Sequence, residues 1–177
     1  MRRHILLLAT ALALFACGDK DSGTTTEPGG NGGTGGTGGT GGTVGTATNG
    51  TFTAQIGNVN WGAQGTVTVT RNGNVISLGG TGLVGTASAY SVILTFGGAT
   101  ATGTYSLNYL NQSGSNLIVG GQTGGWGTFF SGGTGTATIT TLTSNRVAGT
   151  FSGDAVPATA GAVGTLQVRN GRFDITF

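Results

Sequence analysis

The sequence predicts an all-β domain, an antiparallel β-sandwich or flattened β-barrel, preceded by a leader and a disordered glycine-rich linker. Through most of residues 47–177, apolar and polar residues alternate with a period of two, as in strands that bury one face. No segment of this region shows the 3.6-residue period of an amphipathic helix. Short Gly/Asn pairs separate the alternating runs, which is typical of tight hairpin turns. We expect about nine or ten short strands, mostly paired with their neighbours in sequence.

The N-terminus has the pattern of a leader. Arg2 and Arg3 precede an apolar run, residues 5–15, which is too short to span a bilayer and is followed by polar residues. This pattern predicts a signal peptide rather than a transmembrane helix.

The end of the apolar run carries a lipidation motif. Leu14 stands three positions before Cys17, and the small residue Ala16 stands directly before it. This arrangement resembles the bacterial lipoprotein box, which implies that residues 1–16 are removed and that membrane lipid is attached to the Cys17 thiol. Two or three acyl chains anchor a protein stably. The alternative is an ordinary secretory leader followed by an incidental cysteine.

The lipoprotein resemblance also implies a location. Proteins of this kind lie in the bacterial cell envelope, and Gly18 in place of aspartate suggests the outer membrane, on its periplasmic or its surface side. Residues 17–46 then form a tether, in which residues 29–43 repeat a Gly-Gly-Thr triplet. Such a segment buries too little apolar area to fold, so we expect it to be flexible.

Three turn signals fix the expected pairing of the domain's strands. They are Gly57-Asn58, Asn72-Gly73 and Asn170-Gly171. Two-residue loops there put apolar residues opposite each other, and a slip of one residue would reverse every face. The expected pairs are Ile56 with Val59, Ala54 with Trp61, Val69 with Ile76, Val67 with Leu78, Val168 with Phe173, and Leu166 with Ile175.

Three further segments follow the same alternation. At Ser144-Asn145 a two-residue loop would set Ile139 against Thr150. We favour a three-residue loop, because it aligns Ala137, Ile139 and Thr141 with Phe151, Gly149 and Val147 respectively. Two more sets of residues are each expected to share one strand face: Tyr90, Val92, Leu94 and Phe96 in one strand, and Tyr105, Leu107 and Tyr109 in another.

Several landmarks of the domain resemble a known family. They are the opening Phe52-Thr-Ala-Gln-Ile56 with Trp61, the step Gly103-Thr-Tyr105, the segment Gly149-Thr-Phe-Ser152 and the closing residues 170–177. Together they are similar to small cell-envelope lipoproteins of unknown function from Bacteroidetes-like bacteria. The resemblance implies an all-β fold and an envelope location, and it implies no catalytic residue.

The residue inventory excludes most chemistry. From Cys17 onward there are five basic and five acidic side chains, so the net charge is zero and nucleic acid is not an expected partner. The only histidine, His4, lies in the leader, and the only cysteine is Cys17, so Ser-His-Asp, Cys-His and His/Cys zinc sites cannot form. Asp154 and Asp174 are the only Asp or Glu residues of the domain. We expect Asp154 in a turn and Asp174 in a surface ion pair that relieves the juxtaposition of Arg169 and Arg172 across the last hairpin. We expect neither an enzyme nor a cofactor.

Three non-enzymatic roles remain open. The first is a structural or surface-coating lipoprotein. The second is a module that binds a neutral glycan, a peptide or another envelope component, with Trp126 as the first candidate residue and Tyr105 and Tyr109 behind it. Glycines flank Trp126, which would leave its ring open to a ligand, although packing in the core is the simpler interpretation. The third is a flat ice- or mineral-binding threonine face, made of Thr66, Thr68 and Thr70 and of Thr134, Thr136, Thr138 and Thr140.

Overall fold

The computed structural model describes residues 43–47, 50–85, 88–108, 110 and 113–177. This part of the chain contains twelve strands and no helix, which confirms the all-β class and exceeds the expected strand number. Among the described residues, no helix is long and apolar enough to cross a membrane. The strands are β1 (Thr43–Ala47), β2 (Gly50–Ile56), β3 (Val59–Ala63), β4 (Val67–Asn72), β5 (Val75–Val84), β6 (Ser88–Phe96), β7 (Gly103–Ser106), β8 (Asn116–Gly121), β9 (Gly124–Gly127), β10 (Thr134–Leu142), β11 (Arg146–Pro157) and β12 (Leu166–Thr176).

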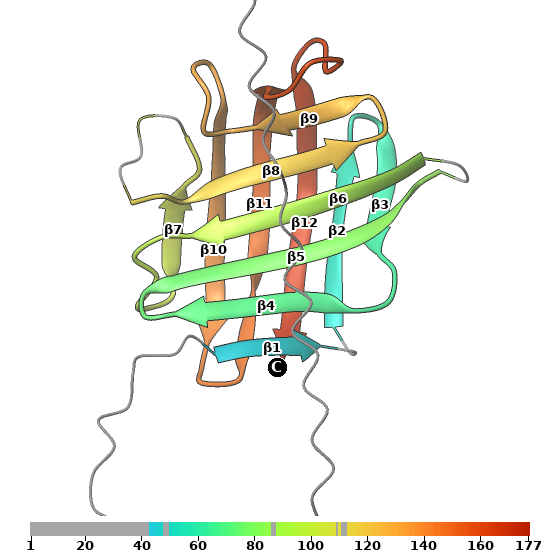
Figure 1. Cartoon of the computed structure of the whole chain (residues 1–177). Coiled ribbons are helices and arrows are strands. Elements are labelled where there is room, and N and C mark those ends of the chain that lie inside the picture. Colours follow the sequence, from blue (N-terminus) through green and yellow to red (C-terminus); the bar gives the residue numbers. More distant parts are fainter. Residues whose placement is uncertain (1–42, 48–49, 86–87, 109, 111–112) are drawn as a thin grey trace, which may run out of the picture. The chain divides into compact units, whose positions relative to one another are not determined.

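Backbone pairing closes eight antiparallel strands into a ring. The ring runs β5-β3-β2-β12-β11-β9-β8-β6 and returns to β5 through the β5–β6 pairing. Figure 1 shows these strands in two layers that cross steeply, with β5, β6, β8 and β9 in front and β10, β11, β12 and β2 behind. The fold therefore combines the closed pairing of a barrel with the two facing layers of a sandwich.

The two longest strands of the front and back layers act as branch points. One edge of β5 pairs with β6 along nearly its whole length, while the other edge pairs first with β4 and then with β3. In the same way, β11 pairs with β12 on one edge and with both β10 and β9 on the other. The strands β4 and β10 leave the ring at these points, and each carries one more strand, β1 and β7 respectively.

The core between the layers is apolar and aromatic. It contains one large cluster of buried residues, to which every strand from β2 to β12 except β7 and β9 contributes, and Tyr105 on β7 packs against it. A continuous series of ring contacts crosses it, with centroids 5.3 to 6.4 Å apart, through Trp61, Phe52, Phe151, Phe173, Phe96 and Tyr105. Edge-on and tilted contacts of this kind stabilise beyond the area they bury. The shared face expected for β6 is confirmed, because Val92, Leu94 and Phe96 are buried and Tyr90 packs against the core.

Two of the expected registers are confirmed. The turn at Gly57-Asn58 pairs Ile56 with Val59 and Ala54 with Trp61. The favoured register of β10 and β11 also holds over most of its length, where Ala137 faces Phe151 and Ile139 faces Gly149. A bulge at Thr140 then shifts the register, so Thr141 faces Ala148 and not Val147 as expected. The expected three-residue loop is wrong, because the Thr143 N–H donates to the Arg146 carbonyl at 2.9 Å and only Ser144 and Asn145 lie between them.

The turn expected at Asn72-Gly73 is wrong by one residue. The loop residues are Gly73 and Asn74, and only Gly73 takes a positive φ, 55°, whereas a type I′ turn needs a positive φ at both positions. The Asn74 carbonyl accepts a hydrogen bond of 2.7 Å from the Ala99 N–H, so a contact from another loop holds this turn. The register shifts by two, which preserves the buried faces. The observed pairs are Val69 with Leu78 and Arg71 with Ile76.

The hairpin expected at Asn170-Gly171 is also wrong. Both residues lie inside β12, which runs through without a turn and pairs with β11 on one edge and β2 on the other. They form a β-bulge: Gly171 faces Phe151 and Val168 faces Gly153, so one strand has an extra residue. Asn170 supplies the left-handed conformation, with a φ of 53°. The continuous strand makes hydrogen bonds on two edges, which a terminal hairpin would lose.

The sheet begins inside the segment expected to be tether. β1 pairs with β4 from Thr43 opposite Arg71 to Ala47 opposite Val67. The backbone pairing therefore extends four residues into the segment assigned to the linker, residues 17–46, so the domain starts no later than Thr43.

Closure of the ring requires a glycine where β3 meets β5. A Cβ atom on Gly82 would overlap the backbone carbonyl of Gly62 on β3. Gly79, in the same strand, has nothing within 4 Å of the corresponding position. Gly79 therefore serves as the matched control for a substitution at Gly82.

We expect Gly82→Ala to lower the stability of the full chain by about 1–3 kcal/mol, the usual result of overpacking. For a domain of this size, this is a fall in melting temperature of roughly 3–12 °C, measurable by circular dichroism. The control Gly79→Ala should leave the melting temperature unchanged or slightly raised. Equal shifts in melting temperature in the two variants would contradict the close approach of Gly82 on β5 to Gly62 on β3.

Candidate functional site

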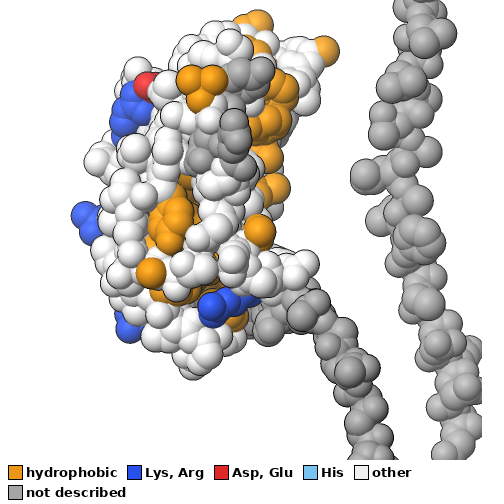
Figure 2. Space-filling view, turned by 90° about the vertical axis from the view of Figure 1, so that its left-hand side faces the viewer, with side chains coloured by type: hydrophobic (Ala, Val, Ile, Leu, Met, Phe, Trp, Pro, Cys, Tyr) orange, Lys and Arg blue, Asp and Glu red, His pale blue; other side chains and the backbone are white. Residues whose placement is uncertain are grey.

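The two layers present different outer surfaces. In Figure 2 the back layer lies to the left, where Lys and Arg side chains (blue) project, while hydrophobic side chains (orange) gather on the opposite edge. Exposed hydrophobic residues of the front layer include Val75, Leu83 and Ile93. The outward side chains of β7, β10, β11, β12, β2 and β3 are instead almost all polar, and we call this surface the polar face.

One row of the polar face crosses five adjacent strands in register. The paired positions run from β7 through β10, β11 and β12 to β2. Neighbouring strands lie about 4.8 Å apart, so the row presents a regular series of hydroxyl groups with one guanidinium group in it. We call it the arginine row, and its members are Thr104, Thr138, Thr150, Arg172 and Thr53.

A second row runs beside the first. Its hydroxyl groups come from β7, β10 and β11, and its amides from β2 and β3. The Asn170 side-chain amide donates a hydrogen bond of 2.8 Å to Gln55 Oε1, which joins this row to the bulge. We call it the amide row, and its members are Ser106, Thr136, Ser152, Arg169, Gln55 and Asn60.

The β12 bulge gives the polar face its cationic groups. A regular strand alternates its sides, whereas the extra residue makes Arg169, Asn170 and Arg172 all face outward, and Gly171 is buried between them. A Cβ atom on Gly171 would lie 2.5 Å from Cδ1 of Phe151 and 2.5 Å from its carbonyl oxygen. In this bulge Asn170 supplies the positive φ, and Gly171 supplies a position without a side chain.

The domain has more basic than acidic side chains. Residues 50–177 contain four arginines and two aspartates, so this part of the chain has a net charge of +2, although the chain from Cys17 onward is neutral. Asp154 is bound by Arg169, whose guanidinium also donates to the Gly153 carbonyl at 2.7 Å. Asp154 lies within β11, so the turn expected there is wrong.

The second aspartate is held by a two-point ion pair. Asp174 accepts hydrogen bonds from Nε and Nη2 of Arg146 at 2.9 and 2.8 Å, so a surface ion pair is confirmed. These bonds lower the pKa of the Asp174 carboxyl and raise the pKa of Arg146. The partner is Arg146 on β11, so the expected pairing with Arg169 and Arg172 across a hairpin is wrong.

Arg172 has no such partner. Its side chain is exposed, and no hydrogen bond or ion pair joins its guanidinium to another residue in the described ranges. Arg71 is different, because its Nη1 donates to the Thr143 carbonyl at 3.0 Å. Arg172 is therefore the free cation of the polar face.

Shallow hollows cover the polar face. Four of them, with volumes of about 370, 380, 300 and 400 Å³, share lining residues and are all open to solvent. Arg172 lines three of the four, and Arg169 lines two. The surface is thus an extended, open depression lined by hydroxyl, amide and guanidinium groups, rather than an enclosed pocket.

The open aromatic ring expected at Trp126 is not there. Only 6% of Trp126 is exposed, and its indole N–H donates to the Gly164 carbonyl at 3.2 Å. The loop that follows β11 holds this position, because Ala158 and Thr159 both hydrogen-bond to Gly125. The flanking glycines allow close packing of that loop and do not expose the ring, so the core interpretation holds.

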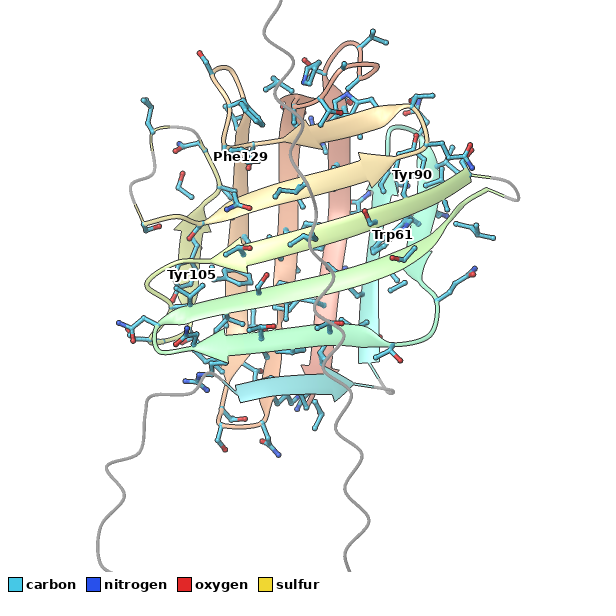
Figure 3. The ribbon with its side chains drawn as sticks, in the orientation of Figure 1. Trp61, Tyr90, Tyr105 and Phe129 are labelled. Atoms are coloured by element: carbon cyan, nitrogen blue, oxygen red, sulfur yellow. The ribbon has the colours of Figure 1, made fainter. Side chains whose placement is uncertain are left out.

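The other sequence-predicted residues do not form a site with Trp126. Figure 3 places Tyr105 at the left-hand end of the fold, on the opposite side from Trp61 and Tyr90. The Tyr105 hydroxyl donates to the Ala101 carbonyl at 2.6 Å and its ring contacts Phe96, so it has an internal role. Tyr109 lies outside the described residues.

The leader, Cys17 and residues 18–42 also lie outside the described ranges, so lipidation stays a prediction. Within those ranges, no three His, Cys, Asp or Glu side chains come close enough together to hold a metal ion.

Sequence reasoning missed the polar face. The alternation did predict that its threonines point outward, but the row is formed by pairing strands that are distant in sequence. The only signal for the cationic centre was Arg-Asn-Gly-Arg at positions 169–172, and it was interpreted as a hairpin turn.

The chain matches no protein-family model, and neither the curated proteins nor the solved structures compared with it show a significant similarity. The resemblance to envelope lipoproteins therefore stays a prediction, and the function has to be argued from the site itself.

The Arg146–Asp174 pair predicts a pH dependence. Because the folded-state pKa of Asp174 is lowered, the pair stabilises the fold above the unfolded-state pKa of about 3.9, and this contribution is lost as the pH falls through the lower folded-state value. NMR titration of the Asp174 carboxyl should show a midpoint below about 3.9. Arg146→Gln should raise the midpoint and the control Arg71→Gln should not. An unchanged midpoint in Arg146→Gln would contradict this assignment.

Proposed function

We propose that this chain is a non-catalytic, lipid-anchored protein of the bacterial cell envelope whose β domain binds a glycan through the polar face. The observation that carries the binding role is the continuous open depression over the arginine row and the amide row. Its groups are hydroxyls, side-chain amides and guanidinium groups, which are the hydrogen-bonding partners that sugar hydroxyls need. Its open, extended form suits a polymer better than a small molecule, which pockets usually enclose.

The anchor is supported by the sequence. The lipoprotein-like motif at Cys17 and the glycine-rich segment after it are useful together: lipid holds one end of the tether, and the other end leads into the sheet at β1. By analogy with lipoproteins of this type, the outer membrane is the proposed location.

A non-catalytic role is supported by the residue inventory. Residues 50–177 contain no His, Cys, Lys or Glu, and each of the two aspartates is engaged by an arginine. General acid–base catalysis by a carboxyl group is favoured by a pKa near the working pH, whereas that of Asp174 is lowered.

The structural or surface-coating role is the second candidate. It is favoured by the apolar outer side of the front layer, which carries Leu83 and Ile93 and would suit packing against other components of the envelope. The threonine-face role receives less support. One of its two rows lies in or beside β4 in the front layer and the other in β10 in the back layer, so they do not combine into one face.

The anchoring part is tested with Cys17→Ser in the producing bacterium. We expect the wild-type chain in the membrane pellet and the variant in the soluble envelope fraction, because the variant has no thiol to acylate. Retention of the variant in the pellet would rule out anchoring through Cys17.

The binding part is tested with a pair of matched threonine substitutions. Thr150 lies in the arginine row, whereas Thr81 is an exposed strand residue of the front layer. In pull-down on insoluble and immobilised polysaccharides, we expect Thr150→Leu in the full chain to weaken binding about tenfold and Thr81→Leu to leave it unchanged. Absence of binding to every polysaccharide by the wild-type chain would favour the structural role instead.

A further inference from the structure

Arg172 lies at the centre of the polar face. Its guanidinium has no partner among the described residues, whereas those of Arg71, Arg146 and Arg169 each have one. Arg172 stands in register between Thr150 on β11 and Thr53 on β2, and it lines three of the four hollows. Both aspartates are already occupied by other arginines. From this arrangement we propose that the ligand of the polar face is an acidic glycan, and that Arg172 binds its carboxylate group. This inference rests on the glycan-binding function proposed above.

The charge balance of the face favours an anion over a neutral sugar. Arg146, Arg169 and Arg172 stand against Asp154 and Asp174, which leaves one positive charge, and that charge is the unpaired one. The sequence predicts a neutral ligand because the domain has few charged side chains, but those few are not balanced. The domain alone is positive, and its free cation lies where the hollows meet.

The chemistry of the neighbouring groups fits a carboxylated sugar ring. A guanidinium group donates two parallel hydrogen bonds to a carboxylate, and such charge-assisted bonds are roughly twice as strong as neutral ones. The hydroxyl groups of Thr150 and Thr53 lie on either side and can donate to or accept from ring hydroxyls. The Asn170–Gln55 hydrogen bond uses one amide N–H and one amide oxygen, which leaves Asn170 Oδ1 and the Gln55 amide N–H groups available.

A denser polyanion fits less well. Nucleic acid binding draws on several unpaired cations along a phosphate backbone, whereas this face offers one. A glycan with one carboxylate per sugar and hydroxyl groups between the charges matches a row with one arginine among four threonines.

The test compares Arg172→Gln with Arg71→Gln in the full chain, purified in detergent micelles. Both variants lose one positive charge, but Arg71 lies in β4, away from the residues that line the four hollows. Binding is measured to immobilised polygalacturonate, to a neutral galactan and to dextran sulfate, at low and at physiological salt.

We expect wild type and Arg71→Gln to bind polygalacturonate equally, within about twofold, and Arg172→Gln to bind about tenfold more weakly, as loss of a charge-assisted hydrogen-bond pair requires. Arg172→Lys keeps the charge without the two parallel donors, so its affinity should lie between the two. Galactan should bind more weakly than polygalacturonate, and the difference should shrink in Arg172→Gln. Melting temperatures of all variants check that they fold.

Several outcomes would overturn the inference. Equal losses in Arg71→Gln and Arg172→Gln would show that only net charge matters. A preference for dextran sulfate that Arg172→Gln does not change would assign the binding to general polyanion attraction. Equal binding of galactan and polygalacturonate, unaffected by Arg172→Gln, would leave glycan binding in place and remove the acidic ligand. If the wild-type chain binds none of the three polysaccharides, both the acidic ligand and the glycan-binding function are contradicted.

Discussion

The rest of the structure depends on closure of the backbone hydrogen-bond ring. Eight strands complete each other's pairing, and closure takes place through β5 and β11, each of which changes partner along one edge. A closed ring leaves few unpaired edges for aggregation, but it forces neighbouring backbones together where strands change direction. The chain meets this constraint with residues that have no side chain, as at Gly82 against Gly62 on β3. The high glycine content of the domain therefore has a structural reason distinct from that of the tether.

The same constraint produces the candidate site. The β12 strand pairs with both β11 and β2, and at Asn170-Gly171 it has one residue more than either partner, so both registers shift at the same bulge. The additional residue places Arg169, Asn170 and Arg172 on one side within four positions. Burial of Gly171 against Phe151 ties the bulge to the aromatic series of the core. The outer cationic centre is thus supported from inside the fold.

Local patterns in the sequence predicted the faces of the strands well, and distant pairings poorly. Alternation identified Val92, Leu94 and Phe96 as buried because period two depends only on the strand itself. The register at Gly57-Asn58 was predictable because the two-residue turn determines the pairing of the hairpin without contacts from other strands. At Asn170-Gly171 the Asn-Gly pair forms a β-bulge and not a hairpin turn. Both a hairpin turn and this bulge need a positive φ, so only the pairing with neighbouring strands distinguishes them. Closure of the ring, and with it both rows of the polar face, depends on contacts that no local pattern encodes.

Two features of the candidate site do not follow from local composition. At Trp126, flanking glycines suggested an open ring, but small residues equally allow a loop to pack closely, and the loop after β11 does so. The net charge of zero from Cys17 onward also differs from the charge of +2 over residues 50–177, and the local charge is the relevant one because an ion is screened beyond about 10 Å. Composition measures what a segment contains, whereas recognition depends on which groups are left without partners after folding. In this domain the folded pairing satisfies Arg146 and Arg169 with carboxylates, satisfies Arg71 with a backbone carbonyl, and leaves Arg172 exposed among hydroxyl groups. That difference among four arginines, rather than their number, makes Arg172 the candidate recognition residue.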